Sequence, residues 1–412
     1  MQTARTAARL YAGYKLKALS LIAFVSIGLG LIMLAFDLLF NSFNAFFDRH
    51  ADYFLPRYLV ARKAGLDLIE PNYSIADMAL KEDDRKAVIR ALGDDFEIQD
   101  ISYFYAMFQY RRNPARRFWA LVVGVDFDRI ERLFPYFEGK ISAEQKARYK
   151  KEPLIMADSE MAGWRSISTG DSLTLLSADY FQDYNGIKVS VGDIRPTPMK
   201  DDDSMGVPVV YIDLSHIRRL LAMPQGVGLP LALAPKRPAH AISLADAANM
   251  GAIRKAAAPL GLAPYSVVTV STNLYKTYTL YGGLLVFFSA FLVVIMVAAI
   301  SATLAINFQN RKADFGLMKA FGCSDRRLLG LLVSENAIGL AIPLCLACVA
   351  NLGVGLAVKP FKVVSNFVVS PRASPAGALI VAASAVLICA VSSIRPYGLL
   401  KRIDPVDILR EE

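Results

Sequence analysis

Four long apolar stretches constrain this chain of 412 residues more than any other feature of its sequence. Each has at least about 20 mostly apolar residues, the length that an α-helix needs to cross a hydrocarbon layer roughly 30 Å thick. The stretches are residues 19–40, 278–308, 328–358 and 376–394. They explain why 54% of the residues are hydrophobic and only 20% are charged. We predict an α-helical membrane protein with one N-terminal and three C-terminal transmembrane helices.

The first stretch could instead belong to a cleaved signal peptide, because four basic residues lie in the segment 1–18 before it. Its apolar block is about twice as long as the 7–15 residues usual in such peptides. Residues 41–48 are bulky and do not form a small-residue cleavage site. A retained membrane anchor is therefore the favoured interpretation.

The distribution of basic residues predicts the topology, because Lys and Arg beside membrane helices favour the cytoplasmic side. Segments 1–18, 309–327 and 395–412 carry four, five and four of them, and the short connector 359–375 carries three. Both termini and residues 309–327 are therefore expected in the cytoplasm. Residues 41–277 and 359–375 are expected outside it.

Residues 41–277 are predicted to form one large extracytoplasmic α+β domain, because strands and helices follow one another without strict alternation. This segment has 30 Lys and Arg against 29 Asp and Glu. The overall charge of +9 therefore comes from membrane-flanking residues, and nucleic-acid binding is unsupported. The segment has no cysteine, so an ordinary hydrophobic core must stabilise it.

Local patterns predict the elements of this domain. Strands are expected at 153–157, 169–175, 186–194, 208–213, 239–244 and 265–271. Helices are expected at 79–92, 158–164, 216–221 and 245–259, and loops at 201–203 and 223–238.

The β-rich, aromatic stretch 98–127 is interrupted by the segment Arg111–Arg117, whose Asn-Pro pair is a turn signal. We predict a β-hairpin with a basic tip. The tip either binds anionic lipid or a partner, or is a solvated turn. The aromatic run Tyr103–Tyr110 is expected in the core, with a partner or substrate surface as the alternative.

The sequence has no pattern that indicates catalysis in this chain. It contains no Gly-x-x-x-x-Gly-Lys-[Ser/Thr] loop for nucleotide phosphates and no Gly-x-Ser-x-Gly or His-Glu-x-x-His motif. Its three histidines are scattered, and no residues have the spacing of zinc ligands. The pair Cys345 and Cys348 lies in an apolar helix, where cysteine behaves as a small hydrophobic residue. We therefore predict neither catalytic residues nor a metal site.

The connector between the second and third apolar stretches is the most informative segment. A helix is expected to end near Phe321 and stop at Gly322, and Ser324 or Asp325 is expected to cap the next helix. Phe315, Met318 and Lys319 share a helix face by their i, i+3, i+4 spacing. A protein pressing on that face would move both membrane helices, whereas the alternative is a simple linker on the lipid surface.

Several polar and small residues are expected within the membrane helices. Glu335 should face protein, because a carboxylate in lipid is costly, and Lys319 or Arg327 is its expected partner. The alternative is that Glu335 reaches to the inner interface. Small residues that favour close helix packing are Gly28, Gly30, Ala298, Ser301, Ala302 and Ala305.

Residues 311–324 read RKADFGLMKAFGCS and precede a helix that carries Glu335, and residues 402–410 read RIDPVDILR. These patterns resemble those of the MacB/FtsX-like permease family. The order of one helix, a large external domain and three helices is also similar, as is the segment 154–175. Asp314 stands where the family commonly has Glu, which leaves the subfamily open.

The resemblance implies that two permease chains pair, as a homodimer or a heterodimer, and that each binds a cytoplasmic ATPase through residues 309–327. A separate P-loop ATPase would bind ATP and Mg, so no cofactor is expected in this chain. The resemblance assigns coupling to Asp314, Phe315, Gly316, Met318, Lys319, Phe321 and Gly322. Membrane lipid is a further expected partner, and a periplasmic adaptor or carrier protein stays open.

The resemblance also implies the permease subunit of an ABC exporter in the cell inner membrane, with residues 41–277 in the periplasm. ATP-driven motion would reach this domain and move or extract a substrate from the periplasmic side. Lipoproteins, lipid-linked molecules, peptides and drugs are the substrate classes considered. The alternative within the family is a division-type scaffold that uses the same motion to activate a cell-wall hydrolase without transport.

Overall fold

The computed structural model describes residues 15–69, 73–196, 208–237, 239–270, 272–359, 361–364, 367–369 and 372–401. Most of the N-terminal segment 1–18, the predicted loop 201–203 and the sequence pattern 402–410 lie outside them. The chain divides into two compact units. The helical unit comprises residues 1–42, 280–361 and 369–412, and the α/β unit comprises residues 43–279 and 362–368.

Within the described residues, four helices are long and apolar enough to cross a membrane, as the sequence predicts. They are α2 (Lys15–Tyr53), α10 (Thr272–Asn310), α12 (Asp325–Ala357) and α13 (Pro375–Ser392). With 39 residues each, α2 and α10 are roughly 58 Å long, about twice the hydrocarbon thickness. Both helices therefore extend well beyond the apolar stretches that identify them.

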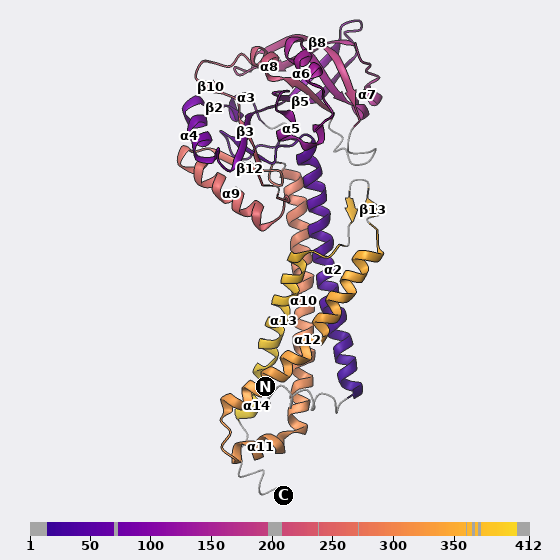
Figure 1. Cartoon of the computed structure of the whole chain (residues 1–412), viewed down its shortest axis with the longest axis vertical. Coiled ribbons are helices and arrows are strands. Elements are labelled where there is room, and N and C mark those ends of the chain that lie inside the picture. The colour runs from indigo at the N-terminus through magenta and orange to yellow at the C-terminus, as the bar shows by residue number, and fades with distance from the viewer. Residues whose placement is uncertain are drawn as a thin grey trace. The chain divides into compact units, whose positions relative to one another are not determined.

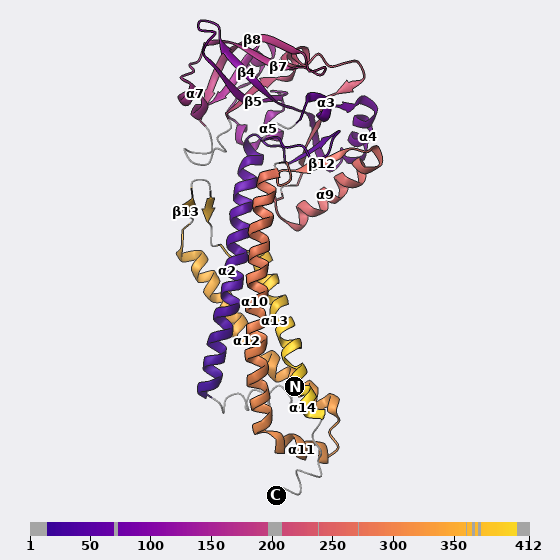
Figure 2. The same cartoon turned by 180° about the vertical axis from the view of Figure 1, so that it is seen from behind.

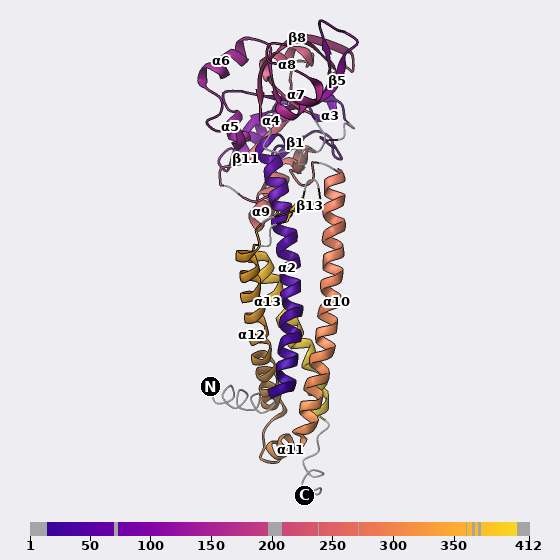
Figure 3. The same cartoon turned by 90° about the vertical axis from the view of Figure 1, so that its right-hand side faces the viewer.

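These helices form a bundle with one shared core within the helical unit, and Figure 3 shows their long segments running alongside each other. The buried core residues are Val25, Leu29, Ile32, Met33 and Phe36 of α2, Met296 and Ile300 of α10, Leu340 and Ala347 of α12, and Val381 and Ile388 of α13. Gly28 allows α2 to approach α10 closely, since a Cβ there would lie 2.6 Å from Sδ of Met296. A Cβ on Gly30 would lie 3.9 Å from Cβ of Ala347.

The remaining small residues predicted for packing divide between two faces of α10. Ala305 is buried, and Ser301 donates a hydrogen bond of 3.5 Å to the carbonyl of Ser392 on α13. Ala298 and Ala302 are exposed on the surface of this single chain. Their predicted contact with another helix would therefore need a second molecule.

Two short helices complete the helical unit. Helix α11 (Lys312–Ala320) lies between α10 and α12, and α14 (Ile394–Lys401) follows α13. Both lie at the same end of the bundle in the opposite views of Figures 1 and 2. Pro343 lies inside α12, where it removes one backbone hydrogen bond.

The α/β unit contains a four-stranded antiparallel sheet in the order β12-β1-β11-β3. Its strands are β1 (Tyr58–Ala61), β3 (Phe96–Asp100), β11 (Leu231–Pro235) and β12 (Ala263–Ser266). Helices α4 (Glu82–Leu92) and α9 (Leu244–Ala257) pack on it through Val88, Leu92 and Ile253.

A closed barrel of six strands makes up the rest of this unit, in the order β4-β5-β9-β6-β8-β7. Its strands are β4 (Ser102–Tyr110), β5 (Arg117–Val125), β6 (Leu154–Asp158), β7 (Ser172–Ala178), β8 (Tyr184–Arg195) and β9 (Val209–Asp213). Neighbours β5 and β9, and β6 and β8, are parallel, and the other pairs are antiparallel. Phe104 and Phe108 lie in the barrel core and Tyr103 is buried, so the core prediction for the aromatic run is confirmed for these residues.

The other described elements are short. They are α3 (Ile75–Met78), α5 (Ile130–Leu133), α6 (Ala143–Lys151), α7 (Ser159–Arg165), α8 (Leu214–Leu220), the 3₁₀ turns Pro135–Phe137 and Ala258–Leu260, and the strands β2 (Leu80–Lys81), β10 (Val227–Gly228), β13 (Phe361–Val364) and β14 (Phe367–Val369).

Three local predictions are wrong. The predicted loop 223–238 contains β11, a strand that pairs with both β1 and β3. The predicted strand 239–244 is not a strand, because its Ser243 is the N-cap of α9 and accepts a hydrogen bond from the backbone N–H of Asp246. Strand β12 ends at Ser266, before the predicted 271, because the next residues form a turn in which Thr269 donates its N–H to the Ser266 carbonyl.

Candidate functional site

The connector between α10 and α12 folds as the sequence predicts. Gly322 has a φ of +81°, which favours glycine, and its N–H donates 2.9 Å to the Lys319 carbonyl. The N–H of Cys323 donates 3.0 Å to the carbonyl of Met318, which closes the end of α11. Ser324 is at the N-cap position of α12, although its side chain makes no capping hydrogen bond. Residues 311–324 are therefore an ordered helix and turn.

One face of α11 packs inside the helical unit. Phe315 is only 1% exposed and stacks on Phe308 of α10, with ring centroids 5.1 Å apart. The same apolar cluster contains Leu328, Leu331 and Leu332 of α12 and Leu400 of α14. This cluster, which we call the connector core, joins α11 to three other helices.

Lys319 adds a polar attachment on the same side. Its Nζ donates 3.0 Å to the backbone carbonyl of Leu400 on α14 and lies 3.0 Å from Oδ1 of Asp325 at the start of α12. Deletion of a buried aromatic side chain costs about 3–5 kcal/mol, whereas a partly exposed ion pair contributes about 0–1 kcal/mol. Phe315 is therefore the main attachment, and Lys319 fixes the orientation.

The opposite face of α11 is exposed and partly apolar. Leu317 is 47% exposed and Phe321 is 83% exposed, although both are large apolar side chains. Asp314, Leu317 and Phe321 follow an i, i+3, i+7 spacing, so they lie along one face. We call these three residues the exposed edge.

The exposed side of α11 differs from the face that the sequence predicts for contact with a partner protein. Phe315 and Gly316 are buried, and Met318 and Lys319 are half-buried in contacts within the chain. The i, i+3 spacing correctly places Phe315 and Met318 on one face of α11. Spacing alone does not show whether that face points into the bundle or away from it. Of the residues assigned to coupling, Asp314, Phe321 and Gly322 are the ones that this fold leaves exposed.

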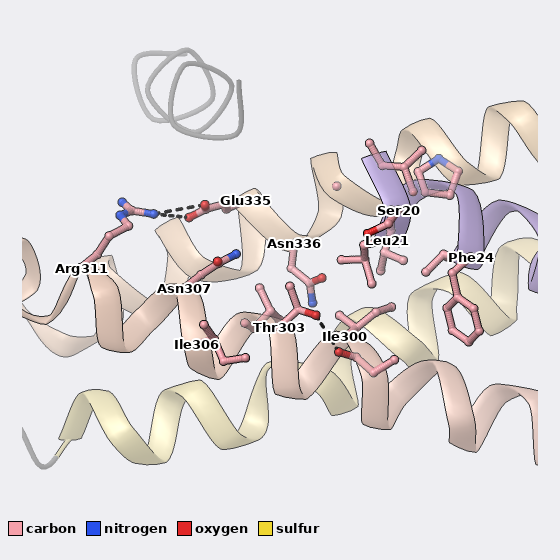
Figure 4. A pocket seen from close by; sticks show the side chains of 17 residues that line it. Ser20, Leu21, Phe24, Ile300, Thr303, Ile306, Asn307, Arg311, Glu335 and Asn336 are labelled. Atoms are coloured by element: carbon pink, nitrogen blue, oxygen red, sulfur yellow. Dashed lines mark hydrogen bonds and ion pairs between the residues drawn. The ribbon is translucent and has the colours of Figure 1, made fainter. Parts of the chain in front are cut away.

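Glu335 has a different partner from either predicted residue. Nη1 of Arg311, the residue directly after α10, donates to both carboxylate oxygens of Glu335 at 3.0 and 3.1 Å (Figure 4). Arg311 is 8% exposed and Glu335 is 9% exposed, so Glu335 faces protein as expected, although its partner differs. The prediction misses this pair because Lys319 is held by Asp325 and Leu400, while the end of α10 places Arg311 opposite the third turn of α12.

Two further polar side chains in the bundle are not anticipated from the sequence. Asn336 donates to Oγ of Ser392 at 2.8 Å and of Ser393 at 3.2 Å, which links α12 to the end of α13. Asp37 is fully buried in α2 and accepts 2.9 Å hydrogen bonds from Asn351 of α12 and from the backbone N–H of Ser374 before α13. Polar residues within otherwise apolar stretches are the signal that could have found both.

A cavity of about 470 Å³ lies between α2, α10 and α12 within the helical unit. Figure 4 shows Arg311 and Glu335 at one end and Leu21 and Phe24 at the other. Its polar lining comprises Ser20, Thr303, Asn307, Arg311, Glu335 and Asn336, and its apolar lining includes Leu21, Phe24 and Ile300. Nε of Arg311 is buried without a hydrogen-bond partner beside this cavity. Among the described residues no group of three or more His, Cys, Asp or Glu is placed to hold a metal ion.

Comparisons with known proteins identify the segment that contains this site. Residues 286–405 match the family model described as FtsX-like permease C-terminal. No curated protein matches the chain. The match covers most of α10, the connector, α12 and α13, and therefore includes Arg311, Glu335 and the exposed edge.

Two solved structures resemble the chain weakly. The periplasmic region of MacB from Actinobacillus actinomycetemcomitans is 8% identical, with a TM-score of 0.30 over 52% of this chain and 89% of that one. The extracellular domain of the noncanonic ABC-type transporter YknZ from Gram-positive bacteria is 10% identical, with a TM-score of 0.29 over 50% and 92%. Conclusions about this chain therefore come from the family model and its own geometry. Residues 286–405 of this chain are therefore similar to the FtsX-like permease C-terminal family, and this segment contains most of α10 and all of α12 and α13, three of the helices long and apolar enough to cross a membrane.

Proposed function

We propose that the exposed edge of α11 receives a cytoplasmic ABC ATPase and that the chain is the permease subunit that carries ATP-driven motion to its α/β unit. The observation that supports this most is the two-faced character of α11. One face exposes Leu317 and Phe321, and the other is fixed in the connector core. When a partner presses on the exposed face, a helix held in this way would move together with the helices to which its other face is attached.

The force would pass to the membrane helices along two routes. Phe315 packs against α10, α12 and α14 through the connector core, and Lys319 binds the Leu400 carbonyl of α14. The Arg311–Glu335 pair joins the end of α10 to the third turn of α12. Displacement of α11 would therefore move α10, α12 and α14 together.

The proposal places the connector in the cytoplasm and the α/β unit outside the inner membrane, with a second permease chain beside this one. The exposed Ala298 and Ala302 of α10 suit close contact with that second chain. A substrate would be moved or extracted on the outer side, and lipoproteins, lipid-linked molecules, peptides and drugs stay as its candidate classes. No observation on the described residues favours the division-type scaffold.

The test is co-purification of the tagged full chain from its own cells, followed by mass spectrometry and an ATP hydrolysis assay. We expect a P-loop ATPase in the wild-type preparation. Burial of a large apolar side chain contributes about 1.5–3 kcal/mol, and about 1.4 kcal/mol corresponds to a factor of ten. Leu317→Asp and Phe321→Asp should therefore each reduce the bound ATPase at least about tenfold.

The matched control is Leu244→Asp, because Leu244 is 92% exposed in the first turn of α9 in the other unit. This variant should retain the ATPase and its hydrolysis at the wild-type level. Retention of the ATPase by Leu317→Asp and Phe321→Asp together would refute the exposed edge as the docking surface. Absence of any P-loop ATPase from the wild-type preparation would refute the proposed function.

A further inference from the structure

The tip of the β4–β5 hairpin concentrates positive charge on the surface of the α/β unit. The hairpin itself is confirmed, since β4 and β5 pair from Ser102 and Gly124 to Gln109 and Arg117. Every residue from Arg111 to Arg117 is exposed, and four of these seven residues are arginines. Such a tip is either a mobile, solvated turn or a surface that other parts of the chain hold in one conformation.

Contacts with a second segment hold the tip in place. The hydroxyl of Tyr110 donates 2.8 Å to the carbonyl of Arg165 at the end of α7, and Nη2 of Arg116 donates to the same carbonyl. The guanidinium of Arg116 also lies over the Tyr110 ring, 4.5 Å from its centroid. Within the tip, Gln109 donates 2.7 Å to the carbonyl of Pro114. These contacts bring Arg165 beside the hairpin, and we call Arg111, Arg112, Arg116, Arg117 and Arg165 the arginine cluster.

The arginine cluster carries more positive charge than the carboxylates around it can pair in the described part of the chain. None of its five side chains makes an ion pair there, whereas ion pairs occur elsewhere in the same unit, such as Arg85 with Asp100 and Arg132 with Glu97. Asp171 is a nearby carboxylate, and its Oδ2 accepts the backbone N–H of Ser168. Protein surfaces normally intersperse both signs of charge, because like charges repel. A fixed cluster of one sign therefore indicates an anionic ligand.

Aromatic side chains border the cluster. Trp164 precedes Arg165 in α7 and is 57% exposed, and Trp119 is 53% exposed. Trp119 lies on the same side of β5 as Arg117, because alternate residues of a strand share a face and both are exposed. These are the only two tryptophans in the sequence. Their exposed rings would contact the less polar part of an amphiphilic ligand.

We infer that the arginine cluster binds phosphate groups, either on a soluble phosphate ester or on a lipid headgroup. Guanidinium groups bind phosphate oxygens with two parallel hydrogen bonds, and several free guanidinium groups on one surface match a multiply charged phosphate. This inference does not depend on ATPase docking, since the cluster and the exposed edge of α11 belong to different units.

The first test uses the two tryptophans as the probe, because both border the cluster. The full chain in a neutral detergent is titrated with sodium tripolyphosphate, and with sodium sulfate and poly-glutamate at matched ionic strength. We expect a saturable change in tryptophan fluorescence with tripolyphosphate, at an affinity at least tenfold higher than with the other two anions. Equal responses to all three anions would overturn the assignment to phosphate.

A second arm distinguishes the sources of phosphate. The chain in phosphatidylcholine nanodiscs is mixed with phosphatidylcholine vesicles that contain or lack phosphatidylglycerol, and binding is measured by flotation. Binding of both tripolyphosphate and phosphatidylglycerol vesicles indicates a general phosphate site. Binding of the vesicles alone assigns the site to lipid headgroups, and binding of tripolyphosphate alone assigns it to soluble esters. No binding in either arm would show that the tip is a solvated turn and would overturn the inference.

Matched variants separate the cluster from overall charge. The cluster variant is Arg111→Gln, Arg112→Gln, Arg117→Gln and Arg165→Gln, and it leaves Arg116 in place to hold the tip. The control variant removes the same charge at exposed arginines elsewhere in the unit, through Arg62→Gln, Arg90→Gln, Arg219→Gln and Arg254→Gln. The cluster variant should lose at least tenfold in affinity and the control less than threefold. Equal losses in the two variants would refute a specific site.

Discussion

The Arg311–Glu335 pair gives the sharpest test of how the connector is attached to the bundle. The pair is about nine-tenths buried, and a single Arg311 nitrogen lies 3.0 and 3.1 Å from the two carboxylate oxygens. Removal of one member of such a pair leaves an uncompensated charge, which costs about 3–5 kcal/mol. We therefore expect Arg311→Leu and Glu335→Leu each to destabilise the chain by about 3 kcal/mol.

The variant that carries both substitutions shows whether Arg311 and Glu335 stabilise the chain as a pair or independently of each other. Independent effects would sum to about 6 kcal/mol, whereas joint replacement of a buried pair by apolar residues is often close to neutral. We expect a cost below about 1 kcal/mol for the double variant, so the coupling energy is about 5 kcal/mol. Unfolding by sodium dodecyl sulfate in mixed micelles, followed by circular dichroism, measures all three variants on one scale.

The Lys319–Asp325 pair is the matched control. Its separation is also 3.0 Å, but the side chain of Asp325 is 43% exposed. Exposed pairs contribute about 0–1 kcal/mol, so a cycle with Lys319→Met and Asp325→Leu should give a coupling energy in that range. Additivity of the Arg311 and Glu335 variants within about 0.5 kcal/mol would refute the reasoning about the buried pair.

Three further predictions concern other parts of the chain. Phe315→Ala should lower the free energy of unfolding by about 3–5 kcal/mol, and Phe321→Ala, at an exposed site, should change it by less than about 0.5 kcal/mol in the same micelle assay. Asp37→Leu should destabilise by about 1–3 kcal/mol for each hydrogen-bond donor left without a partner, and Asp37→Asn by less. Burial raises the pKa of Asp77, but hydrogen bonds from Ser74 together with the ammonium group of Lys63 outweigh it, so this pKa is below its usual value in the folded state. The ionised Asp77 therefore stabilises the folded chain at pH values above the usual aspartate pKa, and this stabilisation is lost as the pH falls through the lower pKa of the folded state. Asp77→Asn should therefore flatten the acidic part of a plot of unfolding free energy against pH.

Each of these predictions has a result that would contradict it. Equal costs for the two phenylalanine substitutions would show that α11 is not packed by one face. A neutral Asp37→Leu would show that its donors find other partners in the bundle. An unchanged profile between the wild type and Asp77→Asn would show that this carboxylate is equally acidic in the folded and unfolded chain.

The sequence predicts the helical unit well because its signals are local. An apolar stretch that spans a bilayer has few alternatives to a helix, and Gly322 ends α11 through a backbone conformation that glycine favours. The β4–β5 hairpin is predicted for a similar reason, since Asn113 and Pro114 form a turn between two aromatic segments.

The errors occur where distant residues decide the outcome. Strand β11 follows glycine- and proline-rich residues and resembles a loop, and its pairing with β1 and β3 makes it a strand. Glu335 has several cations within reach along the sequence, and the packing of α10 against α12 selects Arg311. The face that α11 exposes depends on α14, which lies about 80 residues further along the chain.

The buried carboxyl group of Asp37 limits which helices of the bundle can separate in a conformational change. It accepts hydrogen bonds from α12 and from the N-cap of α13, so moving α2 away from either helix would leave an anion facing hydrocarbon. Ser301 of α10 donates to the Ser392 carbonyl of α13, and Arg311, directly after α10, binds Glu335 of α12. A conformational change that keeps the hydrogen bonds of Asp37 would therefore move α2, α12 and the start of α13 together.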